Sequence, residues 1–144
     1  MTWECVQLEI ERQEGYCREH RITRYHHHNE ENPLSSRITC SICGSTFMQL
    51  RPKKEEEKDQ AFIRAWNFLV SHGLRYAASF REMAREGENE LVRYRAREMA
   101  GVLGDRGRIR EFDYGLCNKV LDHVEVTDVG RLAVIFLPGT RVTV

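Results

Sequence analysis

The residues best suited to chemistry in this sequence are two cysteines, Cys40 and Cys43, in the segment RITCSICGSTF. A C-x-x-C-G turn allows two thiolates to converge on one metal ion, and the glycine that follows relieves the tight backbone. This pattern is typical of one knuckle of a zinc ribbon. Structural zinc sites close with four ligands, however, and no second C-x-x-C pair follows in the sequence. The pattern therefore predicts half of a zinc site, in which the zinc would be structural.

Two residues near the N-terminus could complete this site. Cys17 and His20 stand three positions apart in a segment with helical spacing, so they share a face and could form a Cys3His site with the knuckle. A competing interpretation makes Cys17 a small buried hydrophobe and His20 a solvated residue near a helix end. The histidines at 26–28 could offer a nitrogen instead, although adjacent residues of an extended segment point different ways, which favours a polar linker. The knuckle could also hold two reduced thiols without a metal.

A second chemical feature is a cluster of basic residues between positions 93 and 110. Within this stretch the arginines face only two acidic residues, Glu98 and Asp105. The guanidinium fork suits phosphate oxygens, and each neutralised phosphate adds a salt-dependent increment to affinity without conferring sequence specificity. The candidate phosphate contacts are Arg93, Arg95, Arg97, Arg106, Arg108 and Arg110. The competing interpretation is a solvated helix face that pairs with Glu82, Glu86 and Glu90.

Composition limits the protein that can present these residues. The 144 residues fit one ordinary domain or two small ones, and a hydrophobic content of 41% suffices for a modest core. The 22 basic and 22 acidic residues cancel, so net charge indicates no partner. The chain has five cysteines, and its polar N-terminus lacks the apolar core of a signal peptide, which predicts reduced thiols in a cytoplasmic protein. No stretch approaches the roughly 18 to 20 apolar residues of a membrane-spanning helix.

Apolar periodicity divides the chain into three predicted segments. Residues 1–51 contain an amphipathic helix, with Trp3, Val6, Ile10 and Cys17 at helical spacing, then a linker and a small hairpin around the knuckle. Residues 52–111 contain a helix that begins at Pro52 and ends near Gly73, followed by a coiled-coil-like helical hairpin. Residues 112–144 contain a short helix and a three-stranded antiparallel meander with turns at 128–130 and 138–139. The predicted fold class is α+β, mainly helical.

The expected core comes mainly from the second segment. Its apolar helical faces comprise Phe62, Ile63, Trp66, Leu69, Val70, Leu91, Tyr94, Met99 and Leu103. Cys5 and Cys117 lie on apolar helical faces without a partner at ligand spacing, so we expect both in the core. His72 and His123 stand at predicted element boundaries, where hydrogen bonds to exposed carbonyls explain them without catalysis. The sequence therefore predicts no general base.

Four stretches, taken in order, resemble the C-terminal region of the large serine recombinases. They are VQLEIERQEGYCREH, YHHHNEENPLSSRITCSICGSTF, DQAFIRAWNFL and IREFDYGLCNKVLDHVEVTDVGRLAVIFLPGTRVTV. The resemblance implies a zinc ribbon that sits on attachment-site DNA and a helical hairpin that mediates contacts between subunits. The family places a second cysteine pair before the helix that corresponds to DQAFIRAWNFL, whereas only RPKKEEEKDQ precedes it here. Part of the ribbon is therefore missing from this sequence.

The catalytic domain of that family, with its nucleophilic serine and arginine cluster, has no counterpart in this sequence. None of the serines stands beside a plausible histidine and acid. We therefore predict a non-catalytic module for DNA binding and subunit contact in DNA recombination, with double-stranded DNA as its partner. The alternative is a protein-interaction module whose helical hairpin pairs through Leu91, Tyr94 and Met99 with a second copy or with a full-length recombinase.

Overall fold

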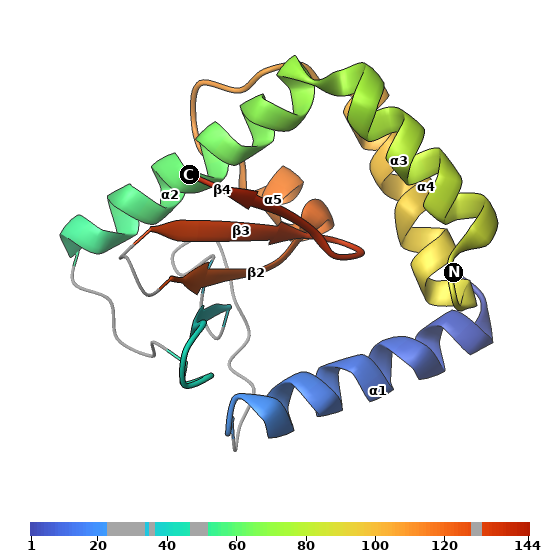
Figure 1. Cartoon of the computed structure of the whole chain (residues 1–144), viewed down its shortest axis with the longest axis horizontal. Coiled ribbons are helices and arrows are strands. Elements are labelled where there is room, and N and C mark those ends of the chain that lie inside the picture. The colour runs from blue at the N-terminus through green and yellow to red at the C-terminus, as the bar shows by residue number, and fades with distance from the viewer. Residues whose placement is uncertain (23–33, 35–36, 47–51, 128–130) are drawn as a thin grey trace.

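The computed structural model describes residues 1–22, 34, 37–46, 52–127 and 131–144. Its fold is α+β and mainly helical, which confirms the predicted class. Helices frame a small sheet, as Figure 1 shows. The elements are α1 (Trp3–Glu19), β1 (Ile38–Cys40), α2 (Pro52–Ser71), α3 (Gly73–Glu86), α4 (Glu90–Asp105), α5 (Tyr114–Val120), β2 (Leu121–Val126), β3 (Leu132–Phe136) and β4 (Thr140–Thr143).

The sheet has the strand order β1-β2-β3-β4. Strands β2, β3 and β4 form the predicted antiparallel meander, with the predicted turn at Pro138 and Gly139, while the other turn lies outside the described residues. The knuckle strand β1 adds to this sheet in parallel with β2, which the sequence did not reveal. The short helix expected over residues 112–124 ends earlier, at Val120, because Leu121 already pairs with Phe136 of β3. Sheet pairing here overrides local helical preference.

One hydrophobic core joins the sheet to α2, α4 and α5. The aromatic rings of Phe62 and Trp66 on α2 are fully buried, and each lies against Phe136 of β3. Cys5 and Cys117 are also fully buried, as predicted. The core cluster contains residues of all three predicted segments, among them Ile38, Leu69, Met99, Leu103, Val120, Val124 and Val142.

Helices α3 and α4 form the predicted hairpin. The turn between them requires glycine at position 87, because a Cβ there would lie 2.6 Å from the Met83 carbonyl oxygen. Asn89 then caps α4 by accepting a hydrogen bond from the Val92 amide at 2.9 Å. The sequence predicted that α2 ends near Gly73. In the structure α2 ends at Ser71 and Gly73 begins α3, so the chain turns at His72. The ring of His72 bonds the Phe68 carbonyl oxygen at 3.0 Å, as a residue at an element boundary was expected to do.

Helix α1 spans the lower edge of the molecule in Figure 1, between α4 and the knuckle. It begins with Thr2 as its N-cap, whose hydroxyl accepts from the Cys5 amide at 3.2 Å. Its predicted apolar face does not enter the core, since Trp3 is 76% exposed and Ile10 is 46% exposed. Polar residues on the opposite side of the helix contact the rest of the protein instead. None of the described helices is long and apolar enough to cross a membrane.

Candidate nucleic-acid interface

The knuckle forms a tight turn at the edge of the sheet. The Cys40 amide donates to the Ser45 carbonyl at 2.9 Å, the Gly44 amide donates to the Cys40 carbonyl at 2.9 Å, and Gly44 has a φ of 74°. This left-handed backbone suits the glycine of the C-x-x-C-G pattern. Cys43 is exposed, and hydrogen bonds with Ser45 and Cys40 lower the pKa of its thiol to about 7. A thiol with this pKa is readily available as thiolate, the form that binds metals.

Of the two residues proposed to complete the knuckle, His20 contacts it. His20 is only 8% exposed, and its Nδ1 lies 2.6 Å from the Gly44 carbonyl oxygen, so it meets the backbone of the knuckle. Cys17 is partly exposed and lines a groove on the outer side of α1. The described residues contain no cluster of three or more potential metal ligands, and residues 26–28 lie outside them. They thus supply fewer than the four ligands of a structural zinc site.

This arrangement makes a prediction about metal content. Replacing Cys17 with serine is expected to leave the zinc content of the purified protein unchanged, because Cys17 does not join the knuckle cysteines in a cluster of three potential metal ligands among the described residues. Elemental analysis of the wild type, Cys17→Ser and Cys40→Ser provides the measurement, with Cys40→Ser as the comparison that removes a knuckle thiol. A loss of zinc in Cys17→Ser would contradict this prediction and would support the Cys3His site.

An ionic network between α1 and β2 was not anticipated from the sequence. Arg12 donates to Asp122 at 2.8 Å and to Glu9 at 2.8 Å, and His123 Nε2 lies 3.1 Å from Glu125. Arg141 of β4 bonds the other carboxylate oxygen of Glu125. His123 was expected at an element boundary but lies within β2. We define these residues, Glu9, Arg12, Asp122, His123, Glu125 and Arg141, as the α1 latch.

The charges of the α1 latch shift one another's pKa values. Burial opposes ionisation of Glu9, Asp122 and Glu125, yet the neighbouring cations outweigh it and lower the pKa of each carboxyl group. Burial also opposes the charged form of His123, but the carboxylates of Asp122 and Glu125 outweigh it and raise the pKa of the imidazole. Each group is therefore held in its charged form, as in a structural ion-pair network.

Four of the six predicted phosphate-binding arginines are in ion pairs. Arg93 and Arg97 pair with Glu90, at 3.0 and 3.8 Å. Glu90 was one of the acids with which the competing interpretation paired these arginines. The other two pairs are Arg95 with Glu9 and Glu98, and Arg106 with Asp113. The side chain of Arg95 is only 18% exposed, so it is poorly placed to reach a ligand. These contacts leave Arg108 and Arg110 as the strongest candidates.

Arg108 and Arg110 belong to a loop that is fixed to α2. We define residues 106–110, which follow α4, as the arginine loop. Trp66 Nε1 donates to the Gly107 carbonyl at 3.1 Å, and the Asn67 amide exchanges two hydrogen bonds with the Ile109 backbone, at 2.9 and 2.8 Å. Both arginines are exposed, and neither has an ion-pair partner among the described residues. The loop therefore holds its backbone against α2 and presents two uncompensated cations.

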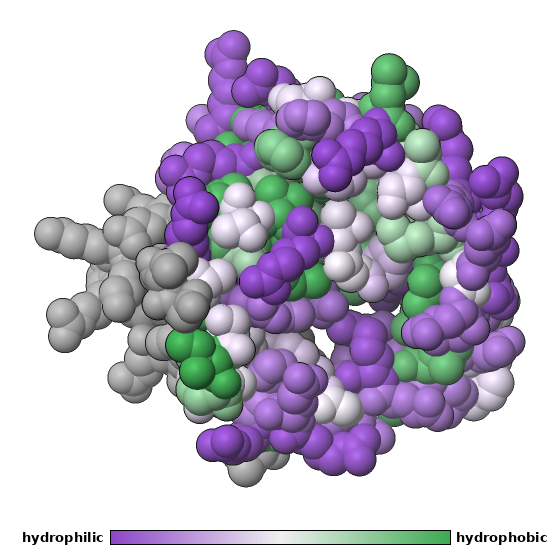
Figure 2. Space-filling view, viewed as in Figure 1, coloured by the Kyte–Doolittle hydropathy of each residue, from purple (hydrophilic) through white to green (hydrophobic). Residues whose placement is uncertain are grey.

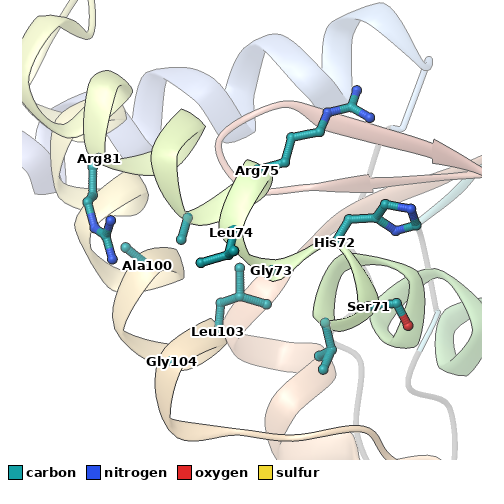
Figure 3. A pocket seen from close by; sticks show the side chains of 11 residues that line it. Ser71, His72, Gly73, Leu74, Arg75, Arg81, Ala100, Leu103 and Gly104 are labelled. Carbon is teal, nitrogen blue, oxygen red and sulfur yellow. The ribbon is translucent and has the colours of Figure 1, made fainter.

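A groove lies where α2, α3 and α4 meet, and its lining extends to Gly104, near the end of α4. It encloses about 580 Å³ and is lined by apolar residues together with His72, Arg75 and Arg81. In Figure 3, Arg81 extends toward Ala100 of α4, whereas Arg75 and His72 point away from that helix. Hydrophobic surface projects at the top of Figure 2, above the α2–α3 corner, among hydrophilic residues. Leu74 at this corner is 94% exposed.

The residues predicted to mediate pairing of the helical hairpin are largely inside the protein. Leu91 is 6% exposed, Met99 is 1% exposed and Tyr94 is partly buried. They pack within the protein, as expected of core residues, and so they do not form an open surface. Any contact between subunits must use a different face of the molecule.

Comparison with protein-family models, with curated proteins and with solved structures found no match to this chain.

Proposed function

We propose that this chain is a non-catalytic module that binds double-stranded DNA through phosphate contacts from the arginine loop. The observation that carries the proposal is the pair of exposed cations, Arg108 and Arg110, on a backbone that Trp66 and Asn67 hold in place. A fixed loop loses little conformational freedom when it binds, so its charges contribute efficiently to affinity. Guanidinium groups also match phosphate oxygens better than ammonium groups do.

The surroundings of the loop support the same partner. Arg75 and Arg81 are exposed and line the groove where α2, α3 and α4 meet, which adds two cations to this part of the surface. The resemblance to large serine recombinases also favours DNA, because it implies contact with attachment sites. Binding of this kind is directed at the phosphate backbone, and sequence preference would come from other contacts.

Titration of a labelled duplex over a range of salt concentrations tests this proposal. Each phosphate contact contributes about 0.9 to the slope of log K against log salt, so Arg108→Ala/Arg110→Ala is expected to reduce the slope by about 2. Affinity at low salt should fall for all duplex sequences alike.

Arg85→Ala provides the matched control, because Arg85 is an exposed arginine on α3 near the opposite end of the hairpin from the arginine loop. Its slope should equal that of the wild type. The absence of duplex binding at low salt, or binding without salt dependence, would refute the proposal, as would an unchanged slope in the double variant.

A further inference from the structure

Helix α1 presents its apolar side to solvent. Its inner side carries the buried Cys5. The same side carries Arg12, which contacts β2, and His20, which contacts the knuckle. The outer side carries Trp3 and Ile10, both exposed, and Val6 and Cys17, both partly exposed. An ordinary surface helix has the reverse arrangement, with its apolar stripe toward the core. The outer stripe therefore has the character of a helix-pairing surface.

The C-terminal half of this stripe contains a groove, which we call the α1 groove. It encloses about 560 Å³ and is lined by Ile10, Gln13, Glu14, Cys17 and Arg18. The first four of these residues follow the spacing i, i+3, i+4, i+7, the spacing of a hole that receives one side-chain knob from a facing helix.

The chemistry of the α1 groove suits an indole. Ile10 and Cys17 provide apolar contact, and Gln13 and Glu14 offer oxygens that can accept the indole N–H. Arg18 can stack its guanidinium on the aromatic face. An exposed indole stands on the same stripe of the same helix, because Trp3 is 76% exposed.

We propose that the α1 groove receives Trp3 of a second copy of this chain, with the two α1 helices antiparallel. Trp3 is 7 residues from Ile10 and 14 residues from Cys17, separations of about 10 and 21 Å along a helix, and it does not line the groove of its own copy. The knob lies near the N-terminus of α1 and the hole in its C-terminal half. An antiparallel pair therefore makes two identical contacts around a two-fold axis, which closes the assembly as a dimer. This surface goes beyond the proposed DNA contact, which is made by different elements.

Sedimentation analysis over a range of protein concentrations tests the dimer. Trp3→Ala is expected to raise the dimer dissociation constant at least about tenfold, as is typical when a central tryptophan is truncated. Leu74→Ala removes a comparably exposed apolar residue from α3 and should leave the constant unchanged. Circular dichroism establishes that both variants are folded. A wild-type protein that stays monomeric at every concentration, or a Trp3→Ala variant that dimerises normally, would overturn the proposal.

A disulfide trap tests the antiparallel orientation. In a background with Cys40→Ser and Cys43→Ser, Trp3→Cys should form a covalent dimer when oxidised glutathione is added at protein concentrations well above the dissociation constant measured for Trp3→Ala. The introduced thiol would pair with Cys17 of the second copy, while two glutathione molecules are released. The additional change Cys17→Ser should abolish the covalent dimer. A covalent dimer that persists after this change would overturn the proposed orientation, and neither result depends on DNA binding.

Discussion

Replacing Trp66 with alanine is expected to lower the free energy of unfolding by about 3–5 kcal/mol. The indole is fully buried, and its ring centroid lies 6.4 Å from that of Phe136 in the sheet. Alanine would leave a cavity at the point where α2 packs on β3, and the surrounding core would relax only partly. Denaturant unfolding followed by far-UV circular dichroism measures the change.

A more conservative variant separates packing from the hydrogen bond. Trp66→Phe keeps most of the aromatic volume but removes the N–H that donates to Gly107, so its cost should be about 1–2 kcal/mol. The variant should stay folded yet bind duplex DNA more weakly, because the arginine loop loses one of its attachments to α2. Phe68→Ala is the control on the same helix, where the side chain is 40% exposed. Phe68→Ala should lower the free energy of unfolding by about 1 kcal/mol or less. If Trp66→Ala lowered it by no more than Phe68→Ala does, the prediction for Trp66 would be contradicted.

The sequence predicted those elements that local patterns determine. The apolar face of α2, including Phe62, Trp66 and Leu69, follows helical periodicity and is buried as predicted. The meander follows from short apolar runs separated by a Pro-Gly turn. By contrast, the parallel pairing of β1 with β2 joins Ile38 to Val124. A contact between positions so far apart in the chain leaves no local signal in a single sequence.

The orientation of α1 was harder to predict for a related reason. Its apolar stripe indicated the core-facing side, but the helix docks through an ion pair between Arg12 and Asp122, which are 110 positions apart. The position of His20 likewise depends on Gly44 of the knuckle. Spacing along the helix placed Cys17 and His20 together, whereas in the structure His20 contacts Gly44 and Cys17 lines the α1 groove. The sequence also could not show which of the candidate arginines form ion pairs and which, like Arg108, do not.

Acid pH is expected to release α1 from the sheet, because the α1 latch depends on charged carboxylates. Glu9, Asp122 and Glu125 have lowered pKa values in the folded protein. Their stabilisation is fully present above their ordinary pKa values, 4.5 for Glu and 3.8 for Asp, and is lost as pH falls through the lowered folded values. Stability should therefore decrease on acidification more steeply than ordinary surface carboxylates would produce.

His123 gives the opposite dependence at higher pH. Its pKa is raised above 6.5 in the folded protein, so its stabilisation is present below pH 6.5 and is lost as pH rises through the raised value. The α1 latch should consequently contribute most between about pH 4.5 and 6.5. His123→Gln should remove the alkaline decline and make the acid decline shallower, because His123 helps to lower the pKa values of Asp122 and Glu125, whereas the pKa of Glu9 does not depend on it. Unfolding free energies measured across this pH range would show both limbs.

Asp122→Asn tests the centre of the α1 latch directly. The substitution leaves Arg12 with Glu9 as its ion-pair partner and is expected to cost about 1–3 kcal/mol, a range that allows for the partial exposure of Arg12. Glu88→Gln is the control, since it neutralises an exposed carboxylate in the α3–α4 turn, away from the α1 latch. Hydrogen exchange should increase within α1 in Asp122→Asn while the core of α2 stays protected, because the ion pair fastens α1 to β2 without contributing to the hydrophobic core. Equal protection of α1 in both variants would show that other contacts hold the helix in place.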